Sequence, residues 1–181
     1  MRFEEGSFTS VLEKAKQEKR MVFVDCYTSW CGPCKLMLQD VFSREDVGQF
    51  MNARFVNLKL DMEKGEGPEL ARKYQVKVYP TFLILNENGE VIHRMVGGMK
   101  VEDFLQNVQD GTGEYSLYSY EKRYAGGERD SRFVYKYIET LSKAFMKERM
   151  EQVLHEYWAT LANQEKSNRE NWSLVKRFVR D

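Results

Sequence analysis

Two cysteines separated by Gly-Pro stand where a buried strand gives way to a helix, in the segment Trp30–Lys35 (WCGPCK). A thiolate at a helix N-terminus is stabilised by unpaired backbone N–H groups and by the positive end of the helix dipole, which lower its pKa. We therefore expect Cys31 to be the nucleophile that attacks a disulfide. Cys34 lies one turn further along the same helix, so it can attack the mixed disulfide and release the reduced product. The motif favours reversible dithiol/disulfide chemistry with Cys34 as the resolving thiol.

Along the chain around the motif, segments whose apolar residues have helical spacing are followed by apolar runs typical of strands. Residues Phe8 to Ala15 have the spacing of an amphipathic helix, with Ser7 or a neighbour as its cap. Further helices are predicted from Cys31 to about Phe42, from the capping-box pattern Ser43–Asp46 onward, over Pro68–Tyr74 and over Val101–Val108. Apolar runs predict strands at Met21–Tyr27, Phe55–Leu60, Thr81–Leu85 and Val91–Val96, the last two joined by a hairpin turn at Asn88-Gly89.

This order of elements predicts an α/β fold, with a central mixed sheet and helices on both faces, within residues 1–110. The cysteine motif follows the carboxyl end of the strand Met21–Tyr27, which is where open α/β sheets place their reactive groups. At Asp110–Gly113 the strand pattern ends and a glycine-punctuated, aromatic-rich sequence begins. We place a domain boundary there and predict an α-helical C-terminal region over residues 114–181.

The C-terminal region is predicted to contain a helical hairpin. A short helix is expected at Leu117–Tyr124, followed by two longer helices broken near Ala144–Met146. Another apolar stripe begins at Trp172 and stops at Asp181, which leaves open that the region is truncated from a longer helical array. Its methionines and aromatic residues are interpreted first as the apolar faces of packed helices, and only second as a groove for a partner.

Composition excludes several classes of function. The chain has 28 basic and 28 acidic residues, so no global field favours nucleic acid or an anionic membrane. No run approaches the roughly eighteen apolar residues of a membrane span. The first residues, Met1–Glu5, form no apolar signal region, although they would also suit the start of a mature exported protein.

Three cysteines are too few, and wrongly spaced, for a disulfide-stapled scaffold. Cys26 lies within the apolar strand Met21–Tyr27 and is interpreted as a core residue. His93 and His155 are far apart in the sequence, with nothing near them that resembles a ligand set, so both are expected to be structural or solvated. We predict no metal site, since neither a second CxxC nor two well-spaced histidines are present to complete a tetrahedron.

The segment Trp30–Lys35 resembles the active site of the thioredoxin family, and the resemblance extends from Phe8 to about Gln109. Asp25, six residues before Cys31, matches the family's buried acid, which implies that it helps to take the proton from the resolving cysteine. Tyr79-Pro80-Thr81 matches the family's cis-proline segment, and Gly97 or Gly98 matches the glycine that lines its substrate groove. The resemblance implies a thioredoxin-like fold whose substrate-binding residues are Trp30, Gly32, Pro33, Tyr79, Pro80 and Gly97.

Three of these residues also have a purely structural interpretation. Asp25 alone would be a hydrogen-bonded carboxylate at a strand end, Pro80 an ordinary turn or edge-strand proline, and Trp30 either a packing residue or a cover for the thiol. The family's lysine near the buried acid is matched by Asn57, so we expect Asp25 to lack that ion-pair partner. Residues 25–30 resemble the thioredoxin-like domains of bacterial envelope disulfide reductases. This favours a periplasmic or envelope protein if a leader has been removed, and a cytoplasmic one otherwise.

The sequence therefore predicts a bacterial thiol-disulfide oxidoreductase, a protein-disulfide reductase that contributes to cell redox homeostasis. Its expected partners are protein thiols and disulfides and an upstream thiol reductase as electron donor, with no cofactor beyond the Cys31–Cys34 pair. The alternative is a thioredoxin-fold scaffold or adaptor whose helical region binds a partner protein. Intact Cys31, Cys34 and Pro80 argue against that alternative.

Overall fold

The computed structural model describes residues 1–166 and 168–178, and their contacts divide the chain into two compact units between Tyr118 and Ser119. The division falls a few residues after the boundary predicted at Asp110–Gly113. Residues 114–118 therefore belong to the first unit. They are joined to its sheet by a hydrogen bond from the backbone N–H of Leu117 to Nδ1 of the buried His93, 3.2 Å away.

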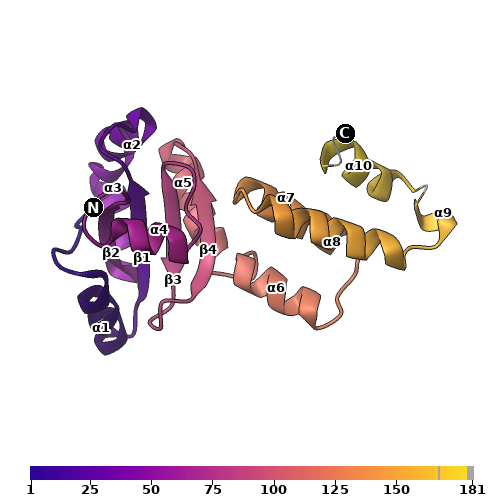
Figure 1. Ribbon diagram of the computed structural model, residues 1–181, viewed down its shortest axis with the longest axis horizontal. Coiled ribbons are helices and arrows are strands. Elements are labelled where there is room, and N and C mark those ends of the chain that lie inside the picture. The colour runs from indigo at the N-terminus through magenta and orange to yellow at the C-terminus, as the bar shows by residue number, and fades with distance from the viewer. Residues whose placement is uncertain (167, 179–181) are drawn as a thin grey trace. The chain divides into compact units, whose positions relative to one another are not determined.

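The first unit is built on a four-stranded mixed sheet in the order β2-β1-β3-β4 (Figure 1). Strand β1 pairs in parallel with β2 and antiparallel with β3, which pairs antiparallel with β4. The predicted strands are confirmed, with one residue added at the end of the second. Their bounds are β1 Met21–Tyr27, β2 Phe55–Asp61, β3 Thr81–Leu85 and β4 Val91–Val96.

Helices cover both faces of the sheet, as predicted. Their bounds are α1 Phe8–Glu18, α2 Gly32–Leu36, the π-helix η1 Met37–Phe42, α3 Glu45–Arg54, α4 Gly67–Lys73 and α5 Val101–Gly111. Helices α1 and α4 pack on one face, in a core that includes Phe8, Val11, Val24, Leu70 and Leu83. Helices η1, α3 and α5 pack on the other, around the buried rings Phe23, Phe42, Phe55, Phe82 and Phe104.

The start of α1 is as predicted, whereas the start of α3 is not. Ser7 caps α1, and its hydroxyl oxygen accepts a hydrogen bond from the backbone N–H of Ser10 at 3.2 Å. The capping box predicted at Ser43–Asp46 does not form, because the Ser43 hydroxyl donates to the carbonyl oxygen of Gln39 in the preceding helix. Helix α3 therefore begins after Arg44, without a side-chain cap.

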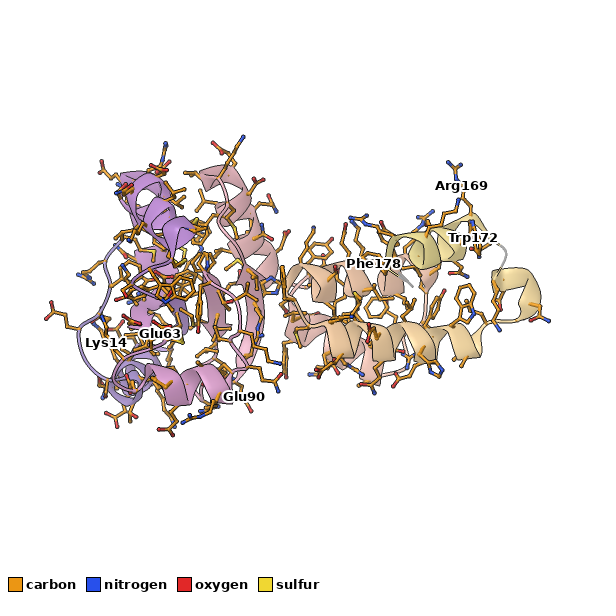
Figure 2. All side chains as sticks on the ribbon, turned by 45° about the horizontal axis from the view of Figure 1, so that its top comes forward. Lys14, Glu63, Glu90, Arg169, Trp172 and Phe178 are labelled. Atoms are coloured by element: carbon orange, nitrogen blue, oxygen red, sulfur yellow. A yellow bond between two sulfur atoms is a disulfide. The ribbon has the colours of Figure 1, made fainter. Side chains whose placement is uncertain are left out.

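The helical region forms as predicted within the described residues. Its helices are α6 Leu117–Ala125, α7 Ser131–Lys143, α8 Lys147–Thr160, α9 Asn163–Lys166 and α10 Arg169–Phe178. The break expected near Ala144–Met146 separates α7 from α8. Arg169, Trp172 and Phe178 all come from α10 (Figure 2). Val179 and Asp181, which belong to the predicted apolar stripe and its end, lie outside the described residues.

Candidate active site

Cys31 and Cys34 form a disulfide at the start of α2, four residues after β1 ends. Cys31 is the N-cap of the helix, and the backbone N–H of Cys34 points at the Cys31 sulfur, with 3.2 Å between nitrogen and sulfur. Pro33 occupies the first turn, where its missing N–H leaves no donor unpaired. The helix therefore presents backbone donors and its positive end to Cys31, as the sequence predicted.

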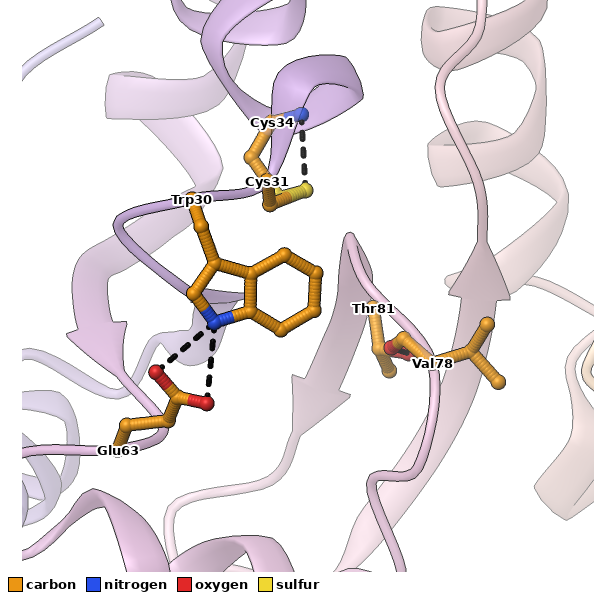
Figure 3. Close-up of a disulfide and its surroundings, with 6 residues drawn as sticks. All are labelled: Trp30, Cys31, Cys34, Glu63, Val78 and Thr81. Carbon is orange, nitrogen blue, oxygen red and sulfur yellow. Dashed lines mark hydrogen bonds between the residues drawn. A yellow bond between two sulfur atoms is a disulfide. The ribbon is translucent and has the colours of Figure 1, made fainter.

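Two aromatic residues, Trp30 and Tyr79, contact each other next to Cys31 of the disulfide. The Trp30 side chain is 65% exposed, and its indole N–H points at both carboxylate oxygens of Glu63, 3.0 and 3.1 Å away (Figure 3). Its ring meets the ring of Tyr79 edge to face, with centroids 6.0 Å apart. Trp30 is thus a surface residue held in one orientation, which favours the second of its two interpretations over simple packing.

The loop before β3 and the loop after β4 meet beside the disulfide. The Tyr79–Pro80 peptide bond is cis, and the backbone N–H of Gly97 donates to the Pro80 carbonyl oxygen at 2.9 Å. Gly97 has a φ of +92°, in the left-handed region that favours glycine. A Cβ atom at Gly98 would lie only 3.5 Å from Cβ of Pro33, so this loop contacts the redox turn. Tertiary structure thus joins segments that the sequence separates by more than sixty residues.

Asp25 is a buried acid in β1. Burial raises the pKa of its carboxyl group to about 7, and the positive charge of Lys59 opposes this rise. Atom Oδ1 accepts no hydrogen bond from any described residue. A carboxyl group with a pKa near neutrality is suited to accept and return a proton at physiological pH.

A lysine other than the one expected acts on Asp25, because the positive charge of Lys59 lowers the pKa of its carboxyl group. In the register of β1 and β2, Asp25 lies opposite Lys59, while Asn57 lies opposite Phe23. The side-chain amide of Asn57 instead donates to the carbonyl oxygen of Arg2 and to Oδ1 of Asn52, both at 3.1 Å.

Lys59 and Glu63 were missed in the sequence. The signal for Lys59 was present, because strands predicted to begin at Met21 and Phe55 place residues 25 and 59 at the same offset. No local pattern marked Glu63, since its contact with Trp30 depends on how the loop after β2 folds back.

The remaining candidates behave as structural residues. Cys26 is a free, fully buried thiol whose pKa is raised by burial. Burial lowers the pKa of His93 to about 4, so this side chain is neutral at pH 7 and accepts the Leu117 hydrogen bond. Within residues 1–166 and 168–178, no group of three or more His, Cys, Asp or Glu side chains could hold a metal ion. No helix in the same part of the chain is long and apolar enough to cross a membrane.

A CxxC disulfide at this strand-to-helix junction, on a mixed sheet covered by helices, defines a thiol-disulfide oxidoreductase. Comparison with known sequences agrees, since a family described as the thioredoxin-like domain matches residues 8–112. The chain belongs to the thioredoxin family.

Solved structures support the assignment. A candidate disulphide-isomerase from Bacteroides thetaiotaomicron is 47% identical, with a TM-score of 0.58 over 62% of this chain and 93% of its own. A thioredoxin from Thermus thermophilus is 28% identical, with a TM-score of 0.57 over 64% and 91% of the two chains.

Related sequences match a little over half of the chain. A thioredoxin-like protein of Synechocystis is 32% identical over 56% of this chain and 91% of its own length. The chloroplastic thioredoxin Y of rice is 32% identical over 58% of this chain, and the match spans only 56% of the rice protein. Each match is about as long as the family domain at residues 8–112.

Proposed function

We propose that the protein reduces disulfides in other proteins through the Cys31/Cys34 pair. The observation that carries this proposal is the position of Cys31 as the N-cap of α2, with the Cys34 backbone N–H aimed at its sulfur. Such a site stabilises a thiolate more than a thiol and makes Cys31 the better nucleophile at neutral pH.

The reaction consumes two electrons from the reduced pair. The Cys31 thiolate attacks one sulfur of a substrate disulfide, forms a mixed disulfide and expels the other sulfur as a thiolate. Cys34 then loses its proton and attacks the Cys31 sulfur. This forms the Cys31–Cys34 disulfide and releases the second substrate thiolate. An external dithiol, supplied by an upstream thiol reductase, returns two electrons and one proton, which restores the Cys31 thiolate and the Cys34 thiol for the next cycle.

Asp25 is proposed to accept the proton from Cys34 in the second step. Its buried carboxyl group, with a pKa of about 7 and an Oδ1 atom without a protein donor, is suited to that transfer. Lys59 tunes the acid, because its positive charge favours the carboxylate form. Trp30, Gly32, Pro33, Tyr79, Pro80 and Gly97 are proposed to contact the substrate.

Two measurements on the full chain test the proposal. Titration of the Cys31/Cys34 pair against glutathione gives its equilibrium redox potential. We expect about −270 mV, the value of a reducing thioredoxin. Cys34→Ser should accumulate mixed disulfides with substrate proteins, while the matched Cys31→Ser should form none.

Other outcomes discriminate between the alternatives. A markedly more oxidising potential would make the protein an oxidase or isomerase. Absence of any exchange by the wild-type pair would favour the adaptor, in which the helical unit binds the partner and the first unit is a scaffold.

A further inference from the structure

The helical unit contains a groove of about 540 Å³, lined by residues of α7, α8, α10 and the turn that joins α7 to α8. All of the lining residues belong to this unit. Its apolar lining consists of Phe145 from the turn, Met150 from α8 and Phe178 from α10 (Figure 2). The volume is in the range of pockets that accommodate a ligand.

The backbone position of Phe145 is one that usually belongs to glycine. Helix α7 ends in a Schellman motif, in which the N–H of Met146 donates to the carbonyl oxygen of Leu141 at 3.0 Å and the N–H of Phe145 to that of Ser142 at 3.1 Å. Phe145 has a φ of +55°, in the left-handed region, and its side chain is 64% exposed. Neither the backbone nor the packing of the unit explains a large aromatic side chain here, whereas a ligand in the groove would cover it.

The part of the groove that α10 contributes is fixed against α7. Arg177 donates hydrogen bonds to Glu139, at 3.1 Å, and to the hydroxyl oxygen of Tyr135. The ring of Phe178 meets the ring of Tyr135 edge to face, with centroids 6.0 Å apart. The buried Met150 adds a flexible thioether, which adapts to ligands of different shape. Two aromatic rings and a thioether thus provide a surface for one apolar side chain of a ligand.

The charges around the groove favour a carboxylate. Three cations and two acids line it, so their formal sum is +1; they are Lys143, Lys147, Arg177, Glu139 and Glu151. Both acids already have partners, since Arg177 pairs with Glu139 at 3.1 Å and Lys147 with Glu151 at 3.5 Å. Lys143 forms no ion pair with any residue that the structure describes. A carboxylate of a ligand would therefore meet an uncompensated ammonium group, while a cation would meet only acids that are already paired.

We propose that this groove binds a segment of a partner polypeptide in which an aromatic or aliphatic side chain is adjacent to a carboxylate side chain. The apolar side chain packs against Phe145, Met150 and Phe178, and the carboxylate pairs with Lys143. Three apolar side chains offer enough surface for one side chain of a partner but not for the length of an acyl chain, which disfavours an anionic lipid. The inference concerns the helical unit and holds whether or not the Cys31/Cys34 pair acts as a reductase.

The test titrates three capped five-residue peptides into the isotope-labelled full-length protein and follows the backbone amide signals by NMR. The peptides are Gly-Glu-Phe-Glu-Gly, Gly-Glu-Ser-Glu-Gly and Gly-Lys-Phe-Lys-Gly. We expect the first peptide to shift the signals of the residues that line the groove, with a dissociation constant of about 1 mM. The serine peptide should bind at least about tenfold more weakly, because it has no apolar side chain to bury. The lysine peptide should bind about fivefold more weakly, because Lys143 repels its charges.

A first pair of variants locates the apolar contact. Phe145→Gly should weaken binding of the acidic phenylalanine peptide about tenfold without lowering the free energy of unfolding, because glycine suits the left-handed position. Trp172→Ala removes another exposed aromatic side chain of the same unit, one that does not line the groove, and should leave the affinity unchanged. Denaturant titration of each variant shows that a loss of binding is not a loss of folding.

A second pair locates the charge contact. Lys143→Gln should reduce the preference for the acidic over the basic phenylalanine peptide from about fivefold to about twofold, because the uncompensated charge is removed. Lys122→Gln makes the same change at an exposed position of α6 that does not line the groove, and should leave the preference at its wild-type value.

The inference would be overturned by equal affinity for the three peptides, or by unshifted groove signals at about 10 mM of the acidic phenylalanine peptide. An unchanged affinity in Phe145→Gly would also contradict it. Sodium dodecanoate is the probe for a lipid. If dodecanoate displaced the peptide and bound more tightly, the groove would be a site for an anionic acyl chain, and the proposed polypeptide partner would be wrong.

Discussion

The two compact units are built around different aromatic cores. In the first unit, phenylalanine rings pack edge to face and stacked between the sheet and the helices of one face; they are Phe23, Phe42, Phe55, Phe82 and Phe104. In the second unit the corresponding rings are mostly tyrosines, with Tyr120, Tyr124, Phe133 and Tyr137 in mutual contact.

The difference lies in the hydroxyl groups. The phenylalanine core has none, so its stability comes from burial and packing alone. In the helical unit, the hydroxyl of Tyr137 donates to Glu121, and that of Tyr157 donates to Oδ1 of the buried Asn171 at 2.9 Å. Such hydrogen bonds fix which helices pair, but each buried polar group then depends on its partner. The stability of the first core therefore depends on how well its rings fill the space between the sheet and the helices. The stability of the second core depends also on the hydrogen bonds of its hydroxyl groups.

The largest expected effect is on the phenylalanine core. Phe23→Ala removes a fully buried ring that contacts four others, and should lower the free energy of unfolding of the first unit by about 3–5 kcal/mol. Denaturant titration gives the loss, and hydrogen exchange read by mass spectrometry assigns it to residues 1–118. Leu38→Ala, at an exposed site, serves as the control and should change stability by less than about 0.5 kcal/mol. Equal loss of protection in both units would contradict independent cores.

The second effect concerns pH. Because the pKa of Asp25 is raised from 3.8 to about 7 in the folded state, the folded chain binds more protons than the unfolded chain between these values. The stability that the protonated Asp25 side chain contributes is fully present below about pH 4 and is lost as the pH rises to about 7. Asp25→Asn should therefore gain stability relative to the wild type over that window, by up to about 4 kcal/mol. A pH-independent difference between the two proteins would refute the assignment.

The helical unit should show the opposite trend at its surface carboxylates. Hydrogen bonds from Arg123 to Glu128 and from Gln152 to Glu156 lower the pKa of each acid. Their contribution is present above the unfolded pKa and is lost as the pH falls through the folded one. Both acids are partly exposed, so the trend should be weaker than that of Asp25 and should decrease with added salt. Unfolding followed by hydrogen exchange at pH 3 and pH 7 separates the two trends.

A smaller effect than that of Phe23→Ala is expected from a single hydroxyl of the second core. Tyr157→Phe removes the donor to Asn171, which is buried, and should cost about 1–3 kcal/mol, confined to residues 119–178. Tyr115→Phe removes the hydroxyl of a tyrosine that is 51% exposed; this residue lies in the first unit and serves as the control for loss of a tyrosine hydroxyl at the surface, with an expected change within about 0.5 kcal/mol. If the two variants were equally stable, hydroxyl pairing would not distinguish the cores.

The smallest effect compares helix caps. Asp130 caps α7 through hydrogen bonds from the N–H groups of Arg132 and Phe133, whereas Ser7 caps α1 through one from Ser10. Asp130→Ala and Ser7→Ala should each cost about 1 kcal/mol, with the larger loss for Asp130 because it serves two donors and its charge faces the helix dipole. Thermal unfolding of both variants at two salt concentrations checks this order, and a larger loss for Ser7→Ala would reverse it.

The sequence alone determined the elements of the first unit and the position of its reactive pair. Apolar runs located β1, β3 and β4 at their observed bounds, and β1 and β3 are buried along almost their whole length because helices cover both faces of the sheet. The CxxC spacing placed Cys31 and Cys34 one helical turn apart, a local property of the chain. The sequence also predicted the break between α7 and α8, because the helical spacing of apolar residues is interrupted near Ala144–Met146.

Only the tertiary structure decided which distant residues meet. The pairing of Asp25 with Lys59 depends on the register between two strands, and that of Trp30 with Glu63 on the path of a loop. The capping box at Ser43–Asp46 failed because the Ser43 hydroxyl had a competing acceptor in the preceding helix. Local patterns report the face that a residue presents, whereas its partner across the fold is set by long-range packing that no single segment encodes.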